Sequence, residues 1–430
     1  MRLRRSVLAT LTGALAAATL TACGNTTEEG ASGASTKASG PCATTAGVTD
    51  DSITIGHLMG LTGPQEAVAP AFLAGFDAYV DAVNADGGID GRKLVVNRVD
   101  NAFDPQKSVS EFGSVAPESA IVAVHGSAAL DAVLPQVEKL CVPTEALAQA
   151  GSTAVQTHVF LPGTPYAYAA INGIDWVQRE KQPGARWGII YQDDALGQEN
   201  LKATKFAAEQ LGVELAAEAS FAYPADTDFS AQVKKMKDAD VDWIMLAALP
   251  PSSIKIVGTA VAAGMKDVKW MNPQVGWSGE LTFETPALDV FAGRVFTSIY
   301  VSGWNSSDAP GLVEAKEFIA KQDPDAQGQL PLFGYIWAKV MVDVLRKASS
   351  AGDLSRQGIN DAVATLGSVD NQGLLCDYAF GEEGQTGNPS RGTMIMETSK
   401  DAAPDGYKQV AGCFESEAAK AFKLESLVSG

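Results

Sequence analysis

The sequence is poor in the residues that build metal and catalytic sites, with three histidines and five cysteines among 430 residues. His57, His125 and His158 lie far apart along the chain, and no cysteine has the CxxC or Cys/His spacing of a metal site. The stretch GWSGE at 276–280 departs from the GxSxG pattern of a nucleophilic serine, and no GxGxxG follows an expected strand. These absences predict no metal, no cofactor and no enzymatic activity.

Cationic side chains are also scarce. The chain has 32 lysines and arginines against 51 aspartates and glutamates, which gives a formal net charge of −19 at pH 7. An acidic surface repels polyanions, so nucleic acid is not expected as a partner. After the first 22 residues, no run is long and apolar enough to span a membrane.

The first 22 residues have the organisation of a secretory signal peptide. Arginines near the start precede a short apolar stretch, which ends in the tetrapeptide LTAC at 20–23. Small residues that lead directly into a cysteine resemble the lipobox of bacterial lipoproteins, in which that cysteine is acylated before cleavage. We therefore expect Cys23 to be the first mature residue and the site of lipidation.

Residues 23–47 are rich in Gly, Ser and Thr and have no apolar period, which is typical of a flexible tether. A lipid, a tether and then a folded body predict a protein anchored to the cell membrane on its extracytoplasmic face. The body exceeds the usual size of a single hydrophobic core, so two domains are expected.

Short β-branched runs alternate with segments of helical period along this body. A first series predicts strands at 52–58, 93–99, 119–126 and 141–147, and a second predicts them at 186–191, 213–221, 241–247 and 268–272. Two such series predict an α/β fold with two doubly wound parallel sheets, each covered by helices on both faces.

Four stretches resemble a known family. They are ITIGHLMGLTGP at 53–64, NADGGIDGRKLVVNRVDNAFDP at 84–105, IVAVHGSAALDAVLPQVEKLCVP at 121–143 and WGIIYQDDALGQENL at 187–201. Over nearly the whole mature length, the chain resembles the extracytoplasmic solute-binding proteins of branched-chain amino acid-type ABC transporters, the leucine/isoleucine/valine-binding family. GGIDGRKL at 87–94 is the most specific piece, because a helix stop, a tight turn and a strand follow in one order.

The resemblance implies a type I periplasmic binding fold, in which two Rossmann-like lobes joined by a three-strand hinge close on a small solute. It places lobe 1 at 48–163 and 298–372, lobe 2 at 164–297 and 373–414, and a C-terminal tail at 415–430. The apolar segment 329–348 is expected to be a helix packed on lobe 1, with Tyr335 and Trp337 in the core or the cleft wall. Three short strands are expected to complete lobe 2, at 374–380, 393–398 and 407–414.

In this family, the carboxylate of an amino acid is held by a hydroxyl residue and backbone N–H groups after the third strand, and by small residues after the fourth. The resemblance therefore assigns ligand binding to Ser127, Ala128, Ala148, Gln149 and Ala150. A hydroxyl and N–H groups at helix starts suit an anion. An alternative is that Ser127 only caps its helix.

The sequence departs from the family where the other end of the ligand is bound. Members that bind amino acids pair the ammonium group with an acidic residue where this chain has Gln274, and place an aromatic residue where it has Leu249. Val68 and Leu196 stand where aromatic residues are often found, and Tyr191 completes the expected site. A buried ammonium without a charged partner costs about 3 to 5 kcal/mol.

The predicted function is therefore capture of a small carboxylated or amide-bearing apolar solute by a monomer, which delivers it to the permease subunits and ATPase of an ABC importer. One alternative is a branched-chain or other amino acid, with Glu66 or Glu145 as the ammonium partner. A second is presentation of the ligand to a sensory system, which uses the same fold.

The four cysteines after Cys23 allow three disulfide pairings in an oxidising compartment. Cys42 precedes the first strand by an arm that, at about 3.3 Å per residue, can reach Cys141 at the expected start of the fourth strand. Cys376 and Cys413 both lie near the C-terminal strands of lobe 2. We expect these to be the two disulfides.

Overall fold

The computed structural model describes residues 40–277, 279, 285–369, 371–377, 379–380 and 390–428. The expected signal peptide, Cys23 and most of the tether lie outside these residues. The described residues belong to one compact unit. None of the described helices is long and apolar enough to cross a membrane.

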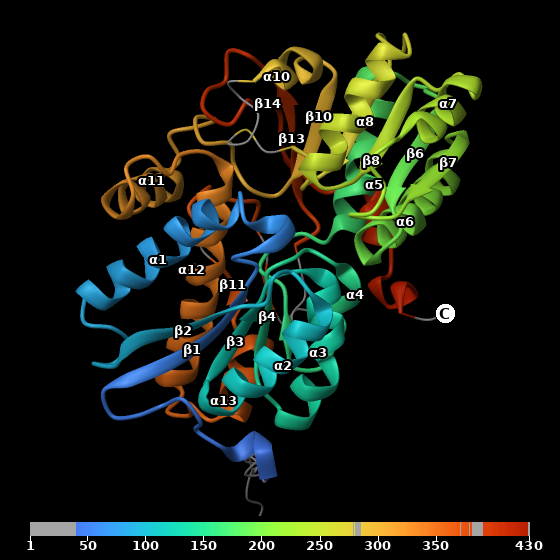
Figure 1. Cartoon of the computed structure of the whole chain (residues 1–430). Helices are drawn as coiled ribbons and strands as arrows, with labels where there is room; N and C mark the ends of the chain where they lie inside the picture. The colour runs from blue at the N-terminus through green and yellow to red at the C-terminus, as the bar shows by residue number, and fades with distance from the viewer. Residues whose placement is uncertain are drawn as a thin grey trace, which may run out of the picture. The chain divides into compact units, whose positions relative to one another are not determined.

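The first sheet has five parallel strands in the order β2-β1-β3-β4-β5 (Figure 1). They are β1 (Ser52–Met59), β2 (Lys93–Asp100), β3 (Ile121–Val124), β4 (Thr144–Ala146) and β5 (Val159–Phe160). The helices packed on it include α1 (Ala69–Ala85), α2 (Pro105–Val115), α3 (Ser127–Leu140), α12 (Gln329–Ser350) and α13 (Arg356–Ala364).

Side chains of this sheet alternate between two buried faces. Ile121 and Ala123 of β3 pack in one cluster with α1 and α12, whereas Val122 and Val124 pack in another with α2 and α3. Because both faces are buried, the strands have nearly continuous apolar sequences, as is usual for a parallel sheet covered by helices.

The second sheet has seven strands in the order β14-β13-β10-β9-β8-β6-β7. They are β6 (Trp187–Gln192), β7 (Leu215–Phe221), β8 (Trp243–Ala247), β9 (Lys269–Pro273), β10 (Val295–Ile299), β13 (Thr393–Thr398) and β14 (Tyr407–Phe414). The first five are parallel to one another. At one edge, β13 pairs antiparallel with β10, and β14 pairs antiparallel with β13.

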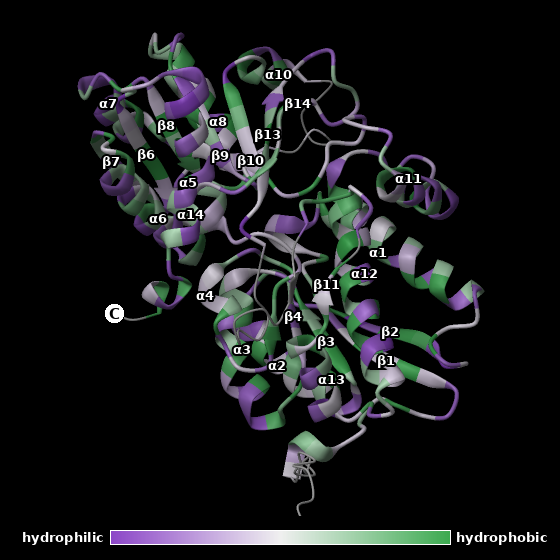
Figure 2. Ribbon diagram, turned by 180° about the vertical axis from the view of Figure 1, so that it is seen from behind, coloured by the Kyte–Doolittle hydropathy of each residue, from purple (hydrophilic) through white to green (hydrophobic). Residues whose placement is uncertain are grey.

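Helices cover both faces of this sheet as well. Ile190 and Leu246 pack with α7 (Ser230–Asp238) and α8 (Pro250–Ala262), and Ile189 and Met245 pack with α5 (Tyr166–Trp176) and α6 (Ala195–Leu211). Figure 2 shows hydrophobic residues on the strands and hydrophilic residues mainly on the surrounding helices and loops. The predicted α/β fold class is confirmed, with the second sheet mixed rather than purely parallel.

The other elements are short or peripheral. They are η1 (Gly40–Ala43), η2 (Gly63–Gln65), η3 (Ala116–Glu118), α4 (Gly151–Ala154), η4 (Val177–Lys181), α10 (Pro286–Phe291), α11 (Pro310–Gln322), β11 (Gly367–Ser368), β12 (Ala379–Phe380), α14 (Glu417–Ala421) and η6 (Leu424–Leu427).

The expected strand at 374–380 is wrong. Its described part does not join the second sheet, because Leu375 pairs with Val301 in an isolated bridge and β12 pairs with β11 in a separate two-stranded sheet. The backbone groups near Leu375 are already bonded to the segment after β10: Ser302 N donates to Leu374 O at 3.0 Å, and Cys376 N donates to Tyr300 O at 2.9 Å. The segment predicted as a C-terminal tail contains α14 and η6, and it buries Phe422 and Leu424.

Both predicted disulfides are confirmed. Cys42 in η1 is bonded to Cys141, with their Cα atoms 5.1 Å apart, and Cys376 is bonded to Cys413 in β14, with a Cα separation of 5.6 Å. Cys141 is the C-cap of α3 rather than the start of β4. The first disulfide ties the N-terminal arm to the first sheet's helical layer.

Candidate functional site

A cavity of about 170 Å³ lies where the carboxyl ends of strands from both sheets converge. Loops after β1, β3 and β4 line it from the first sheet, and loops after β6, β8 and β9 line it from the second. Ligands of open α/β sheets bind at this end of the strands. The cavity is therefore the candidate functional site.

The cavity contains most of the residues that the sequence assigns to ligand binding. Those among its lining are Val68, Ser127, Ala128, Ala148, Gln149, Leu196, Leu249 and Gln274. Ala150 is fully buried behind the wall, packed with Tyr166 and Leu196. Tyr191 is half-buried in β6 and is not among the lining residues.

Glu199 fixes the backbone behind this wall. Its carboxylate accepts hydrogen bonds from Gly151 N at 2.7 Å and from Ala167 N at 2.9 Å, near the starts of α4 and α5. Burial raises the pKa of Glu199 to about 8, and these N–H donors oppose that rise. The bonds hold the neighbouring residues Ala150 and Tyr166 in place beside Leu196.

The N-terminus of α3 points unpaired backbone donors at the cavity. Its N-cap is Gly126, which has a φ of 103° and no capping side chain, and the first helical bond is from Leu130 N to Gly126 O. The preceding N–H groups, of residues 127–129, have no partner within the helix. Gly126 rather than Ser127 is the N-cap, so Ser127 does not cap this helix, and Ser127 is a residue of the cavity lining.

His125, which the sequence analysis did not assign to the site, lines the cavity beside this helix start. Burial lowers the pKa of His125 to about 4, so its imidazole is neutral at pH 7. Its Nδ1 is buried without a hydrogen-bond partner among the described residues. Aromatic rings surround it: Phe103 at 5.2 Å, Phe72 at 5.5 Å and Trp337 at 6.1 Å between ring centroids.

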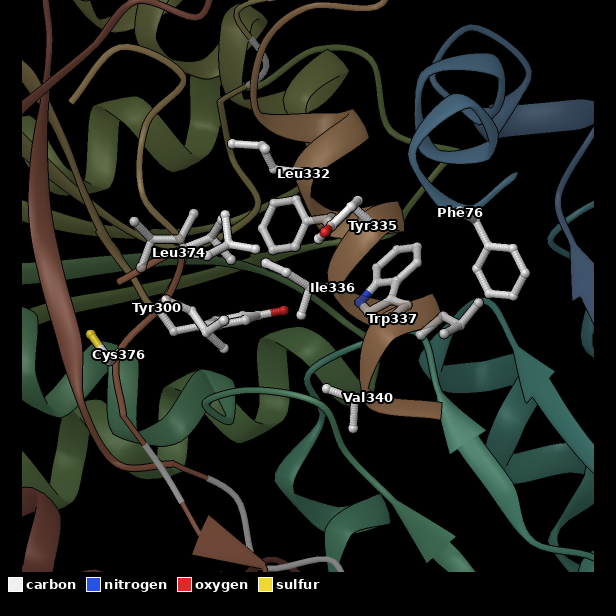
Figure 3. Packing of buried hydrophobic residues seen from close by; sticks show 14 of the residues in the cluster. Phe76, Tyr300, Leu332, Tyr335, Ile336, Trp337, Val340, Leu374 and Cys376 are labelled. Atoms are coloured by element: carbon white, nitrogen blue, oxygen red, sulfur yellow. The ribbon is translucent and has the colours of Figure 1, made fainter. Parts of the chain in front are cut away.

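These rings belong to an aromatic wall formed by Phe72, Phe103, Phe333 and Trp337. Phe72 on α1 stacks on Trp337 of α12, with centroids 4.9 Å apart and an interplanar angle of 22°. Phe333 and Trp337 are four residues apart, so they lie on one face of α12. Figure 3 shows Trp337 and Tyr335 projecting from α12, with Tyr300 alongside. Trp337 was expected in the core or the cleft wall, whereas the three phenylalanines were not predicted to belong to the site.

The lining has little charge. Among the described residues, the lining contains no lysine or arginine, and its one carboxylate is Asp194. That carboxylate caps α6 through Gly197 N at 3.0 Å and accepts from Gln192 Nε2 at 2.8 Å, while Gln192 Oε1 accepts from Leu249 N at 2.7 Å. Asp194 and Gln192 are therefore occupied in joining the loops after β6 and β8.

Neither proposed ammonium partner lies in the lining. Glu66 is exposed. Glu145 is fully buried in β4, where burial raises the pKa of its carboxyl well above its usual range, and its oxygens have no hydrogen-bond partner in the described part of the chain. Among the described lining residues, Asp194 is the one carboxylate that a cationic ligand could pair with.

Gln274 is held in an unusual conformation at the opposite wall. It is 1% exposed, and its φ of 74° is one that side-chain-bearing residues seldom adopt. Its Nε2 donates to the backbone oxygen of Thr164 at 2.5 Å. Its Oε1 has no partner among the described residues. Strain of this kind persists where surrounding contacts impose it, often at ligand sites.

Two α/β sheets whose strand ends meet at a mostly apolar cavity define a protein that encloses a small solute. The family model described as periplasmic binding protein matches residues 52–403. The chain belongs to this family, whose members are solute-binding proteins rather than enzymes. The resemblance predicted from the sequence is confirmed.

Three relatives illustrate the similarity. A fatty acid ABC transporter substrate-binding protein from Thermomonospora curvata is 28% identical, with a TM-score of 0.81, 88% of this chain covered and 96% of that one. The Leu/Ile/Val-binding protein homolog 8 of Brucella melitensis is 26% identical over 361 residues, covering 80% of this chain and 87% of the homolog. The structure of a branched-chain amino acid ABC transporter from Thermus thermophilus with bound valine is 16% identical and has a TM-score of 0.74. The match covers 87% of this chain and 99% of that one, and it shows the shared fold.

Proposed function

We propose that the protein is anchored outside the cell membrane by a lipid at Cys23, captures a small solute in its cavity and delivers it to the permease and ATPase subunits of an ABC importer. The N-terminal LTAC sequence supports the anchor. Membership of the periplasmic binding protein family supports the transport role. The protein acts as a monomer, and presentation to a sensory system is the second use that the fold allows.

The lobes of this clamp are 48–163 with 298–372 and 164–297 with 373–414. Two of the segments that cross between them run side by side, as the backbone bonds from Ser302 N to Leu374 O and from Cys376 N to Tyr300 O support. The third crossing contains Gly163, whose φ of 144° is accessible mainly to glycine. Closure about these three segments would enclose the solute.

The solute is a small carboxylated or amide-bearing apolar molecule. The observation that carries this proposal is the described lining: it has aromatic and aliphatic walls, no lysine or arginine, one carboxylate that already accepts two hydrogen bonds, and a helix N-terminus without a capping side chain. An anion or an amide oxygen can bind the α3 N–H groups without a cation. The cavity of about 170 Å³ is close to the ~150 Å³ that accommodates benzene, which favours a short or single-ring solute.

The relatives support different ligand classes. The Thermomonospora curvata protein is described as a fatty acid substrate-binding protein, which agrees with an apolar acid. The Brucella homologs are named for leucine, isoleucine and valine. An amino acid is the second candidate, with Asp194 as the ammonium partner, because each of its oxygens accepts one hydrogen bond and keeps a further lone pair.

A thermal-shift screen of the mature protein tests this function. Aliphatic and aromatic acids, their amides, and amino acids are compared. A solute at 100 times its dissociation constant should add about 2.7 kcal/mol to the free energy of unfolding. We expect the best acid or amide to stabilise more than leucine or valine. The amino-acid assignment replaces ours if leucine gives the largest shift, and no shift with any solute contradicts the binding function.

The lipid anchor makes a separate prediction. Cys23→Ala removes the thiol that is acylated before cleavage, so the variant should accumulate as an uncleaved precursor. Intact mass and membrane fractionation provide the measurement. Processing of the variant to the wild-type mature mass, with retention at the membrane, contradicts the assignment.

A further inference from the structure

The Gln274 amide has a fixed polarity. Its terminal group lies 2.5 Å from Thr164 O, a main-chain carbonyl that can only accept a hydrogen bond. The Nε2 must therefore face Thr164, and the Oε1 is the remaining polar atom of the side chain. That oxygen is buried and has no partner among the residues that the structure describes, and Gln274 is a residue of the cavity lining. It can accept a hydrogen bond but cannot donate one.

The Thr164 carbonyl opposes reversal of the Gln274 amide, and the loop that carries Gln274 is itself held by hydrogen bonds. Gly276 N donates to Asn272 Oδ1 at 2.7 Å, and Trp277 Nε1 donates to Asp405 O at 2.8 Å. A turn of the amide would place its oxygen against Thr164 O, and two acceptors in contact repel each other. These contacts also hold the positive φ of Gln274, so the Oε1 is oriented before any ligand arrives.

Two other buried amides of the lining have a free atom among the described residues: Gln329 leaves its Nε2, a donor, without a partner, and Gln149 leaves its Oε1. Gln149 Nε2 is 3.2 Å from the Tyr300 hydroxyl, which can donate or accept, so that amide can present either end to a ligand. Gln192 uses both its ends within the protein. Gln274 is therefore the amide whose acceptor is assigned by a main-chain partner.

We propose that Gln274 selects a hydrogen-bond donor on the solute, and that the ligand is a small apolar carboxylic acid which also carries a hydroxyl or amide N–H group. The inference rests on the proposed function and narrows its ligand class. The acid binds the unpaired N–H groups of α3, and the donor binds Gln274 Oε1. A carboxylate, ester or ether in place of the donor would leave two acceptors facing each other.

Matched probes test the proposal by isothermal titration of the wild-type mature protein. One series compares 2-hydroxy-4-methylpentanoate with 4-methylpentanoate, and a second compares 4-hydroxybenzoate with benzoate and 4-methoxybenzoate. In at least one series, the hydroxy acid should bind about 10-fold or more tightly than the probes without a donor, because the unpaired oxygen gains a partner. This comparison needs no variant.

The variant Gln274→Met then tests whether the preference for the hydroxy acid depends on the Gln274 side chain. Methionine has a similar length and no acceptor of comparable strength, so the preference for the hydroxy acid should fall to about one while the melting temperature confirms folding. Gln149→Met is the matched control: it alters a buried amide of the same cavity and should keep the preference, whatever its effect on total affinity.

Each other outcome is informative. Equal binding of acids with and without a donor overturns the selection while leaving the solute-binding function intact. A preference that survives Gln274→Met, or that is lost in Gln149→Met instead, also overturns it. If no probe with a donor binds while a simple acid from the thermal-shift screen does, the proposal is wrong and the proposed function stands.

Discussion

Gly334→Ala is expected to lower the free energy of unfolding by about 3 kcal/mol and to weaken ligand binding. Gly334 lies where α12 crosses α1, and a methyl group there would meet main-chain atoms of α1, including Phe76 N at 2.9 Å. Gly75 on α1 faces α12 in the same way, with Tyr335 N 2.8 Å from its Cβ position. Backbone atoms cannot rotate away, so the helices must separate, and such overpacking is costly.

The separation should also reach the cavity, because α1 and α12 carry Phe72, Phe333 and Trp337 of the aromatic wall. Gly258→Ala is the matched control: this glycine also lies inside a helix, and its Cβ position has no neighbour within 4 Å. Alanine at this position should raise the free energy of unfolding by up to about 1 kcal/mol, because alanine has a higher helix propensity than glycine. Denaturant unfolding of both variants measures the difference, and equal effects at the two positions contradict the packing argument.

The sequence predicts the two sheets well because their signals are local. The run Ile121–Val124 is fully buried, and each strand of this kind is followed by a segment of helical period. The strand at 374–380 was wrong because short apolar stretches do not reveal their partner, and here the backbone near Leu375 pairs with Val301 in an isolated bridge.

The site could be predicted only where it follows strand ends. Ser127 and Gln149 come directly after buried strands, so the resemblance and the rule for open sheets place them in the lining. Phe333 was missed because most of α12 is buried, and periodicity does not separate a core side chain from a cavity side chain. Tyr191 was assigned to the site, yet it is not a lining residue.

The state of Gln274 is a long-range property. Its amide is oriented by Thr164, 110 residues earlier in the chain, and its loop is held by Asp405. The sequence marks Gln274 as a departure from the family but leaves donor and acceptor undecided. The tertiary contact decides between them, and it also determines what a carboxyl group would do at this position.

Gln274→Glu is expected to weaken binding of the best hydroxy or amido acid by about 3 to 5 kcal/mol at pH 8, or two to four powers of ten in affinity. An ionised carboxylate has no N–H for Thr164 O, and the part of the lining that the structure describes has no lysine or arginine to pair with it. A protonated carboxyl can replace the amide, since its O–H donates to Thr164 and its other oxygen accepts from the ligand. The pKa of the introduced carboxyl is therefore raised, and the variant should resemble wild type below that pKa and lose affinity as the pH rises through it.

Titrations with 2-hydroxy-4-methylpentanoate and leucine at pH 5 and pH 8 measure both consequences of Gln274→Glu. Wild type is titrated at both pH values as the reference, because Glu199, with a pKa of about 8, and Asp405, with a pKa of about 6, change protonation within this range. The effect of the introduced carboxyl is the pH-dependent loss of affinity beyond that of wild type. At pH 8 the introduced carboxylate can pair an ammonium group, so the variant should gain measurable affinity for leucine where wild type has little. If wild type binds leucine at micromolar strength with Gln274 in place, the absence of an ammonium site is disproved, and Asp194 becomes the residue to substitute next.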